Sequence, residues 1–118
     1  MSFWRKDVIQ PSLDAETRRH MEEQLEWIAR EPGDARPYYH LAQLYRMESR
    51  SEAALGLLLE AVRLDPAMGD AHVSLTEMYA IAGDYGAAWR HARAAESAGN
   101  GRGVDLLRRY GVTEECGS

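Results

Sequence analysis

A segment of 34 residues, Ala35 to Met68, is followed by a second segment with the same pattern, residues 69–102. The offset of 34 aligns Leu41 with Leu75. It also aligns one pair of tyrosines and three pairs of alanines: Tyr45 with Tyr79, Ala53 with Ala87, Ala54 with Ala88, and Ala61 with Ala95. A fixed period of this length indicates similar supersecondary units stacked side by side.

Each segment carries two runs of apolar residues at helical spacing. In the first segment the runs are Tyr38, Leu41, Leu44 and Tyr45, and then Ala54, Leu55, Leu58, Ala61 and Val62. Apolar residues spaced by three and four predict amphipathic helices. The small side chains of Ala54 and Ala61, two turns apart, let a second helix approach closely. The pattern therefore predicts an all-α fold of repeated helix–turn–helix units.

The residues at these positions resemble the tetratricopeptide repeat family. The first unit reads Tyr38-x-x-Leu41-Ala42-x-x-Tyr45, followed by Ala54, Leu58, Ala61 and Pro66. The second reads His72-x-x-Leu75-Thr76-x-x-Tyr79, followed by Ala88, Ala92 and Ala95. It departs from the family at His72 and Thr76, and Asn100 replaces the closing proline. The resemblance implies a right-handed solenoid of antiparallel helix pairs.

The flanking segments are expected to close the stack at both ends. Residues 12–30 predict a helix in the position of a repeat's second helix, which we interpret as an N-terminal cap. Residues 104–110 predict a short C-terminal capping helix after the glycine-rich stretch 99–103. That stretch follows a helix and lacks the Lys-Ser/Thr of a phosphate loop, so a hinge is the better interpretation. We therefore expect one domain, 12–111, and a frayed tail, 112–118.

The first eleven residues form an arm with four large apolar side chains outside the repeat: Phe3, Trp4, Val8 and Ile9. This arm either docks on its own domain, contacts a second copy of the chain, or binds another protein. Binding to a membrane surface would need a longer basic face. The four side chains are candidates for an oligomer contact.

Net charge argues against a general nucleic-acid binder, because the chain carries −5 with a pI near 5.3 and such binders need a basic face. No apolar run approaches the ~20 residues of a membrane span. The start of the chain lacks the apolar core of a signal peptide. The single cysteine, Cys116, suits a reducing compartment. We therefore expect a cytoplasmic protein.

No group of residues predicts catalysis, so we expect a protein that is not an enzyme and has no cofactor. The four histidines form no i, i+4 ligand pair on one helix. His72 and His91 lie on the two helices of one unit, where they either pack within the repeat or contribute to a metal site. Cys116 has acidic neighbours, Glu114 and Glu115, which disfavour a reactive thiolate.

The family resemblance implies a concave groove, lined by the first helix of each unit, that holds a segment of another protein. Carried onto this sequence, the groove positions are Arg36, Tyr39, His40, Gln43 and Arg46 in the first unit, and Asp70, Val73, Ser74, Glu77 and Ala80 in the second. Some relatives grip a C-terminal carboxylate with lysines and asparagines there, which this chain lacks. The groove is expected to be cationic and aromatic at one end and anionic at the other.

Two functions follow from this surface. The first is an adaptor that binds a peptide or helix of another protein in the groove. The alternative is a self-assembly element, in which the stack or the arm pairs with a second copy. In neither case do we expect nucleic acid as the partner.

Overall fold

The computed structural model describes residues 11–114, and the side chains of residues 15–114. It contains six helices: α2 (Pro11–Arg30), α3 (Ala35–Met47), α4 (Ser51–Leu64), α5 (Gly69–Ile81), α6 (Tyr85–Ser97) and α7 (Arg102–Arg109). No strand occurs within the described residues, so the predicted all-α repeat fold is confirmed. The arm residues Phe3, Trp4, Val8 and Ile9, together with Cys116, lie outside the described residues.

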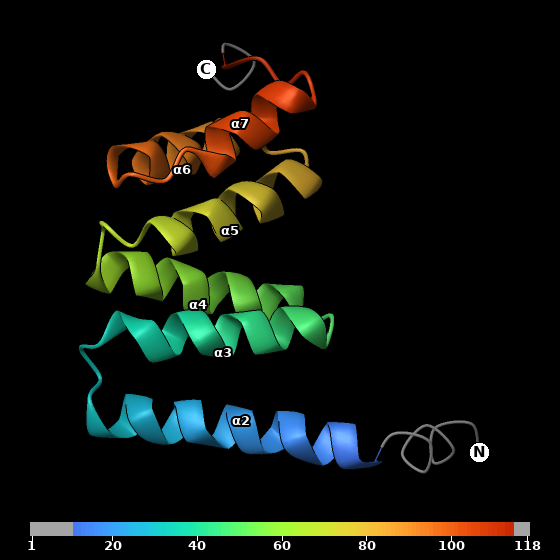
Figure 1. The fold of residues 1–118 in the computed structure, drawn as a ribbon, viewed down its shortest axis with the longest axis vertical. Coiled ribbons are helices and arrows are strands. Elements are labelled where there is room, and N and C mark those ends of the chain that lie inside the picture. The colour runs from blue at the N-terminus through green and yellow to red at the C-terminus, as the bar shows by residue number, and fades with distance from the viewer. Residues whose placement is uncertain (1–10, 115–118) are drawn as a thin grey trace.

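The helices stack in chain order along the long axis of the molecule (Figure 1). Helices α3 and α4 form one unit, and α5 and α6 form the next. Helix α2 packs against α3, and α7 packs against both α5 and α6. The two flanking helices therefore lie at opposite ends of a body whose principal extents are 48 × 36 × 18 Å.

The alanines at the repeat positions form the centre of the stack. Ala54, Leu58 and Ala61 are completely buried, together with Ala42, Ala71 and Leu75 from the neighbouring first helices. Ala53, one position round the helix from Ala54, is only partly buried. This distribution agrees with the helical register that the alanine spacing predicts.

Side-chain caps start the helices that the repeat predicts. The Asp34 carboxylate accepts a hydrogen bond from the Arg36 amide at 3.0 Å and begins α3. Hydrogen bonds from Arg36 lower the pKa of Asp34 to about 2. The Asp84 carboxylate accepts from the Ala87 amide at 3.1 Å and begins α6. Both caps fix the points at which the chain turns back on the preceding helix.

The turn inside each unit places one residue in the left-handed conformation. In the second unit this residue is Gly83, with φ 82°, and in the first unit the equivalent position is Ser49, with φ 61°. The left-handed region is costly for residues with a Cβ and not for glycine. The Ser49 amide donates to the Arg46 carbonyl, and the Arg50 amide donates to the Tyr45 carbonyl, as in a helix C-cap.

We expect Ser49→Gly to raise the free energy of unfolding by ~0.5–1 kcal/mol, because it removes the strain of a side chain at positive φ. Thermal melting followed by circular dichroism measures the change. The matched control is Ser51→Gly, which lies two residues later inside α4 and should destabilise the protein. An unchanged or lower midpoint for Ser49→Gly would contradict the turn geometry.

Gly103 allows α7 to approach the second unit closely, which differs from the expected hinge. The residue is buried within α7 rather than in a linker. A Cβ at this position would lie 3.2 Å from Thr76 Oγ1 and 3.3 Å from both Cα and Cβ of Ala92. The glycine is therefore a packing contact between α7, α5 and α6, which the sequence pattern alone could not separate from a flexible loop.

The chain beyond α7 is packed up to Glu114, whereas the sequence predicts a frayed tail from residue 112. Gly111, with φ 73°, ends the helix and turns the chain back so that the Val112 amide donates to the Leu107 carbonyl at 2.9 Å. Val112 packs against the core between α6 and α7. Glu114 accepts two hydrogen bonds from the Arg93 guanidinium on α6.

Candidate functional site

The first helices of the units, α3 and α5, are connected by side chains that the sequence assigns to the groove. Gln43 donates to the Ser74 hydroxyl at 3.1 Å. The Arg46 guanidinium lies 3.3 Å from the Glu77 carboxylate. These four residues therefore form a polar row across the face made by α3, α5 and α7, which we call the first-helix face. Arg46 and Glu77 partly neutralise each other here, rather than forming separate cationic and anionic ends.

The beginning of α3 carries an aromatic and cationic cluster. The Arg36 guanidinium lies 5.1 Å from the centre of the Trp27 ring on α2, and Trp27 lies 6.4 Å from His40. Tyr39 packs edge to face on His40 at 5.5 Å. Arg36 and His40 are exposed, and Tyr39 is partly buried. The sequence predicts three of these four side chains as groove positions and does not place Trp27 beside them.

The predicted groove residues of α5 are less accessible than those of α3. Val73 and Ser74 are 6% and 5% exposed, because α7 packs against α5 and Gln43 approaches from α3. Asp70 is exposed at the start of α5 and accepts a hydrogen bond from Asn100 at 3.0 Å. A bound segment would therefore meet Asp70, Glu77 and the partly buried Ala80 more readily than the two buried side chains.

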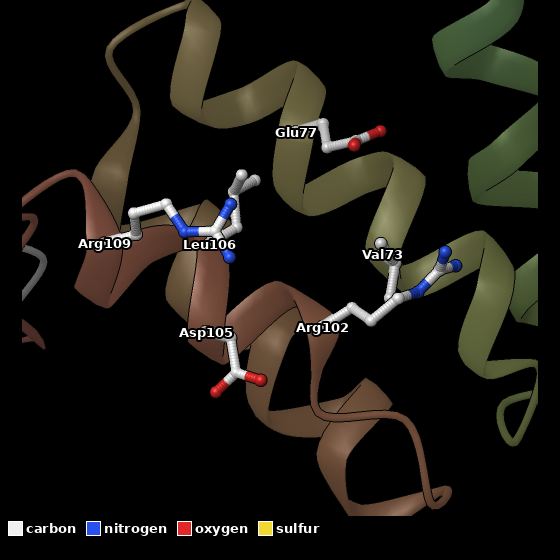
Figure 2. A pocket seen from close by; sticks show the side chains of 6 residues that line it. All are labelled: Val73, Glu77, Arg102, Asp105, Leu106 and Arg109. Carbon is white, nitrogen blue, oxygen red and sulfur yellow. The ribbon is translucent and has the colours of Figure 1, made fainter.

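Two adjoining hollows lie between α5 and α7. The first, about 260 Å³, is lined by Val73, Glu77, Arg102, Asp105, Leu106 and Arg109 (Figure 2). The second, about 460 Å³, is lined by Arg46, Glu77, Ala80, Ile81, Tyr85, Leu106, Leu107, Tyr110 and Val112. They share Glu77 and Leu106. We call the second one the α5–α7 hollow.

The sequence pattern does not assign the apolar residues of this hollow to a site. Ile81 is 83% exposed and Tyr110 is 73% exposed, at the ends of α5 and α7. One signal existed, since Ile81 stands 34 residues after Met47, and Met47 is also 70% exposed. An exposed apolar residue thus recurs at the last position of the first helix. The contribution of α7 could not be found in this way, because it depends on how that helix packs.

The predicted approach of His72 and His91 is confirmed. Their Nδ1 atoms lie 3.0 Å apart, and His72 Nε2 lies 2.9 Å from the Pro66 carbonyl oxygen. A carbonyl only accepts, so His72 carries its proton on Nε2 and accepts at Nδ1 from the Nδ1–H of His91. Tyr79 stacks on His91 with ring centres 5.6 Å apart. The pair therefore joins α5, α6 and the preceding loop in its neutral form.

We expect this pair to make the second unit sensitive to acid. Burial, the proximity of His72 and the charge of Arg90 lower the pKa of His91 from 6.5 to about 4. A lowered folded-state pKa gives stability that is complete above pH 6.5 and is lost as the pH falls toward 4. Between pH 7 and 5 the native protein should lose ~1 kcal/mol more than His91→Gln, because the half-buried ring is partly screened.

Urea unfolding at several pH values measures this difference. The matched control is His20→Gln, which removes an exposed histidine on α2 and should leave the pH dependence of the native protein unchanged. An identical pH dependence in His91→Gln and the native protein would show that the histidine pair does not titrate as its contacts indicate.

The described residues show few features of other functional classes. No three His, Cys, Asp or Glu side chains gather to hold a metal ion in this part of the chain. Among the helices of residues 11–114, none combines the length and hydropathy that crossing a membrane requires.

Comparison with known proteins agrees with the architecture. A family model described as tetratricopeptide repeat matches residues 14–95. No curated protein and no solved structure matches the sequence. Tetratricopeptide repeats generally mediate protein–protein interactions and are typically not catalytic. The family match covers well over half of the chain, from α2 to the end of α6, and the structure shows the stacked helix pairs that it requires. The chain therefore belongs to the tetratricopeptide repeat family.

Proposed function

We propose that the protein is an adaptor, and that it binds a peptide or helix of another protein along the first-helix face. The observation that supports this most directly is the arrangement of side chains on that face. Arg36 and His40 stand exposed on α3, the Arg46–Glu77 pair follows, and the apolar α5–α7 hollow lies beside it. Polar groups that fix orientation next to an apolar hollow are typical of surfaces that bind a protein segment.

The Arg46–Glu77 pair allows the proposal to be tested by charge reversal. The pair is partly exposed, at 27% and 40% of the two side chains, and exposed pairs contribute only ~0.2–1 kcal/mol to stability. Arg46→Glu and Glu77→Arg should therefore leave the helical content and the melting temperature nearly unchanged. Each should lower the amount of partner captured from an extract of the native cell, since a bound segment meets the reversed charge.

The double variant Arg46→Glu/Glu77→Arg separates two explanations for weaker capture. It restores an ion pair between α3 and α5 but presents each charge at the other position. If the partner contacts these groups, capture stays weak. Full recovery would mean that the pair only holds α3 against α5, and it would exclude this part of the face as the contact.

The matched control uses the ion pair between Glu60 and Arg63 on α4. Glu60→Arg/Arg63→Glu makes the same exchange of charge on a second helix, away from the first-helix face. It should capture the partner as well as the native protein does. Binding that survives all reversals on α3 and α5 but is lost in this control would move the site to the opposite face.

A further inference from the structure

The α5–α7 hollow presents large apolar side chains to solvent. Ile81, Tyr110 and Tyr85 are 83%, 73% and 40% exposed, and Leu106 and Val112 complete the apolar wall. Isolated exposed apolar residues are ordinary, but a group of them around one hollow of about 460 Å³ indicates an interaction site. Such a hollow suits a large apolar side chain, because burial of that side chain would also cover the three exposed ones.

The chain itself contains a segment of matching chemistry. The arm, residues 1–10, carries Phe3 and Trp4 followed by Val8 and Ile9, and these have no position in the repeat. Aromatic side chains bury a large area at a small loss of conformational freedom, and they dominate many protein interfaces. The arm therefore offers the kind of apolar side chain that the hollow would accept.

The charges beside the hollow also match the arm. Asp105 and Arg109 line the adjoining hollow, and neither forms an ion pair or a hydrogen bond with the described residues. Figure 2 shows their side chains pointing in different directions from α7. Between its aromatic and aliphatic pairs the arm carries two cations and one anion: Arg5, Lys6 and Asp7. An unpaired carboxylate and an unpaired guanidinium thus stand next to the hollow, opposite in sign to charges on the arm.

The length of the arm favours a second copy of the chain as its source. Trp4 is seven residues before Pro11, where α2 begins, so it reaches at most ~25 Å when fully extended. The long axis of the molecule is 48 Å, and α2 and α7 lie at opposite ends of it (Figure 1). Reaching the hollow of its own chain would require a taut arm, whereas an adjacent copy can present its hollow directly.

We propose that the α5–α7 hollow of one copy receives Phe3 and Trp4 from the arm of a second copy. If the exchange is reciprocal, the result is a closed two-fold dimer with two identical contacts. The proposal is independent of the adaptor proposal, because it concerns the hollow rather than α3.

Complementation between two full-length variants tests the proposal. Phe3→Ser/Trp4→Ser keeps the hollow and alters the arm, while Ile81→Asp keeps the arm and alters the hollow. Sedimentation velocity should show a dimer for the native chain and a monomer for each variant alone, with dimerisation weakened at least ~tenfold. An equimolar mixture should form a dimer again, because one arm and one hollow remain intact.

The control is Leu59→Asp, which places the same charge on an exposed leucine of α4 and should leave the native dimer unchanged. Circular dichroism confirms that the variants are folded. Ile81 is 83% exposed, so its substitution should not lower the melting temperature.

A synthetic peptide of residues 1–10 supplies a second measurement. Titrated into the Phe3→Ser/Trp4→Ser chain, it should bind, and the combined variant carrying Ile81→Asp as well should not bind it. A native chain that is monomeric, a dimer that survives Ile81→Asp, or a mixture that fails to associate would each overturn the proposal. Failure here leaves the adaptor proposal standing, since capture of a different protein by α3 is measured separately.

Discussion

Gly103→Leu is expected to lower the free energy of unfolding by ~2–3 kcal/mol, one of the two largest effects expected from a single substitution. The position has no room for a side chain, because a Cβ would already lie 3.2 Å from Thr76 Oγ1 and 3.3 Å from the Ala92 backbone. Thr76 cannot easily turn away, since its hydroxyl donates to the His72 carbonyl at 2.9 Å. Helix α7 would have to move off the second unit.

Gly56→Leu is the matched control for this substitution. Gly56 lies inside α4, and nothing stands within 4 Å of a Cβ built there. Because leucine forms helix better than glycine, this variant should be stabilised by ~0.5–1 kcal/mol. Chemical unfolding of both variants measures the difference. A Gly103→Leu protein as stable as the native one would contradict the close packing of α7.

The second large effect is expected at Ala61. Ala61→Leu should cost ~2–3 kcal/mol, because the alanine is completely buried between the helices of the first unit and the next helix. Ala54→Leu should have a similar effect for the same reason. Ala53→Leu is the matched control, since it adds the same atoms to the same helix at a partly buried position. Equal melting temperatures for the three variants would show that the helical register is wrong.

The fold could be predicted to this extent because the repeat constrains both period and register. Ala54, Leu58 and Ala61 recur as small or apolar residues at fixed spacing, and the structure buries all three. Helix ends were predictable where a residue has one strong preference, as with the Asp34 cap and left-handed Gly83. Each of these signals is local in sequence, which is why it could be recognised without the structure.

The candidate site was predicted less completely, because part of it depends on contacts between distant segments. The family resemblance placed Arg36, His40 and Arg46 on α3, but not the pairing of Arg46 with Glu77. It also gave no role to α7, whose position depends on the fit of Gly103 against Ala92. A glycine-rich stretch has the same local sequence whether it acts as a hinge or as a close contact, so only the packing distinguishes them.

Site-specific photo-cross-linking in the native cell tests the adaptor proposal most directly. A photoreactive amino acid would replace Arg36 or His40 on the first-helix face, and Arg63 on α4 as the comparison; all three side chains are exposed. Our account predicts covalent adducts of one different protein from positions 36 and 40, with none from position 63. Adducts that form equally or only from position 63 would contradict binding on the first-helix face.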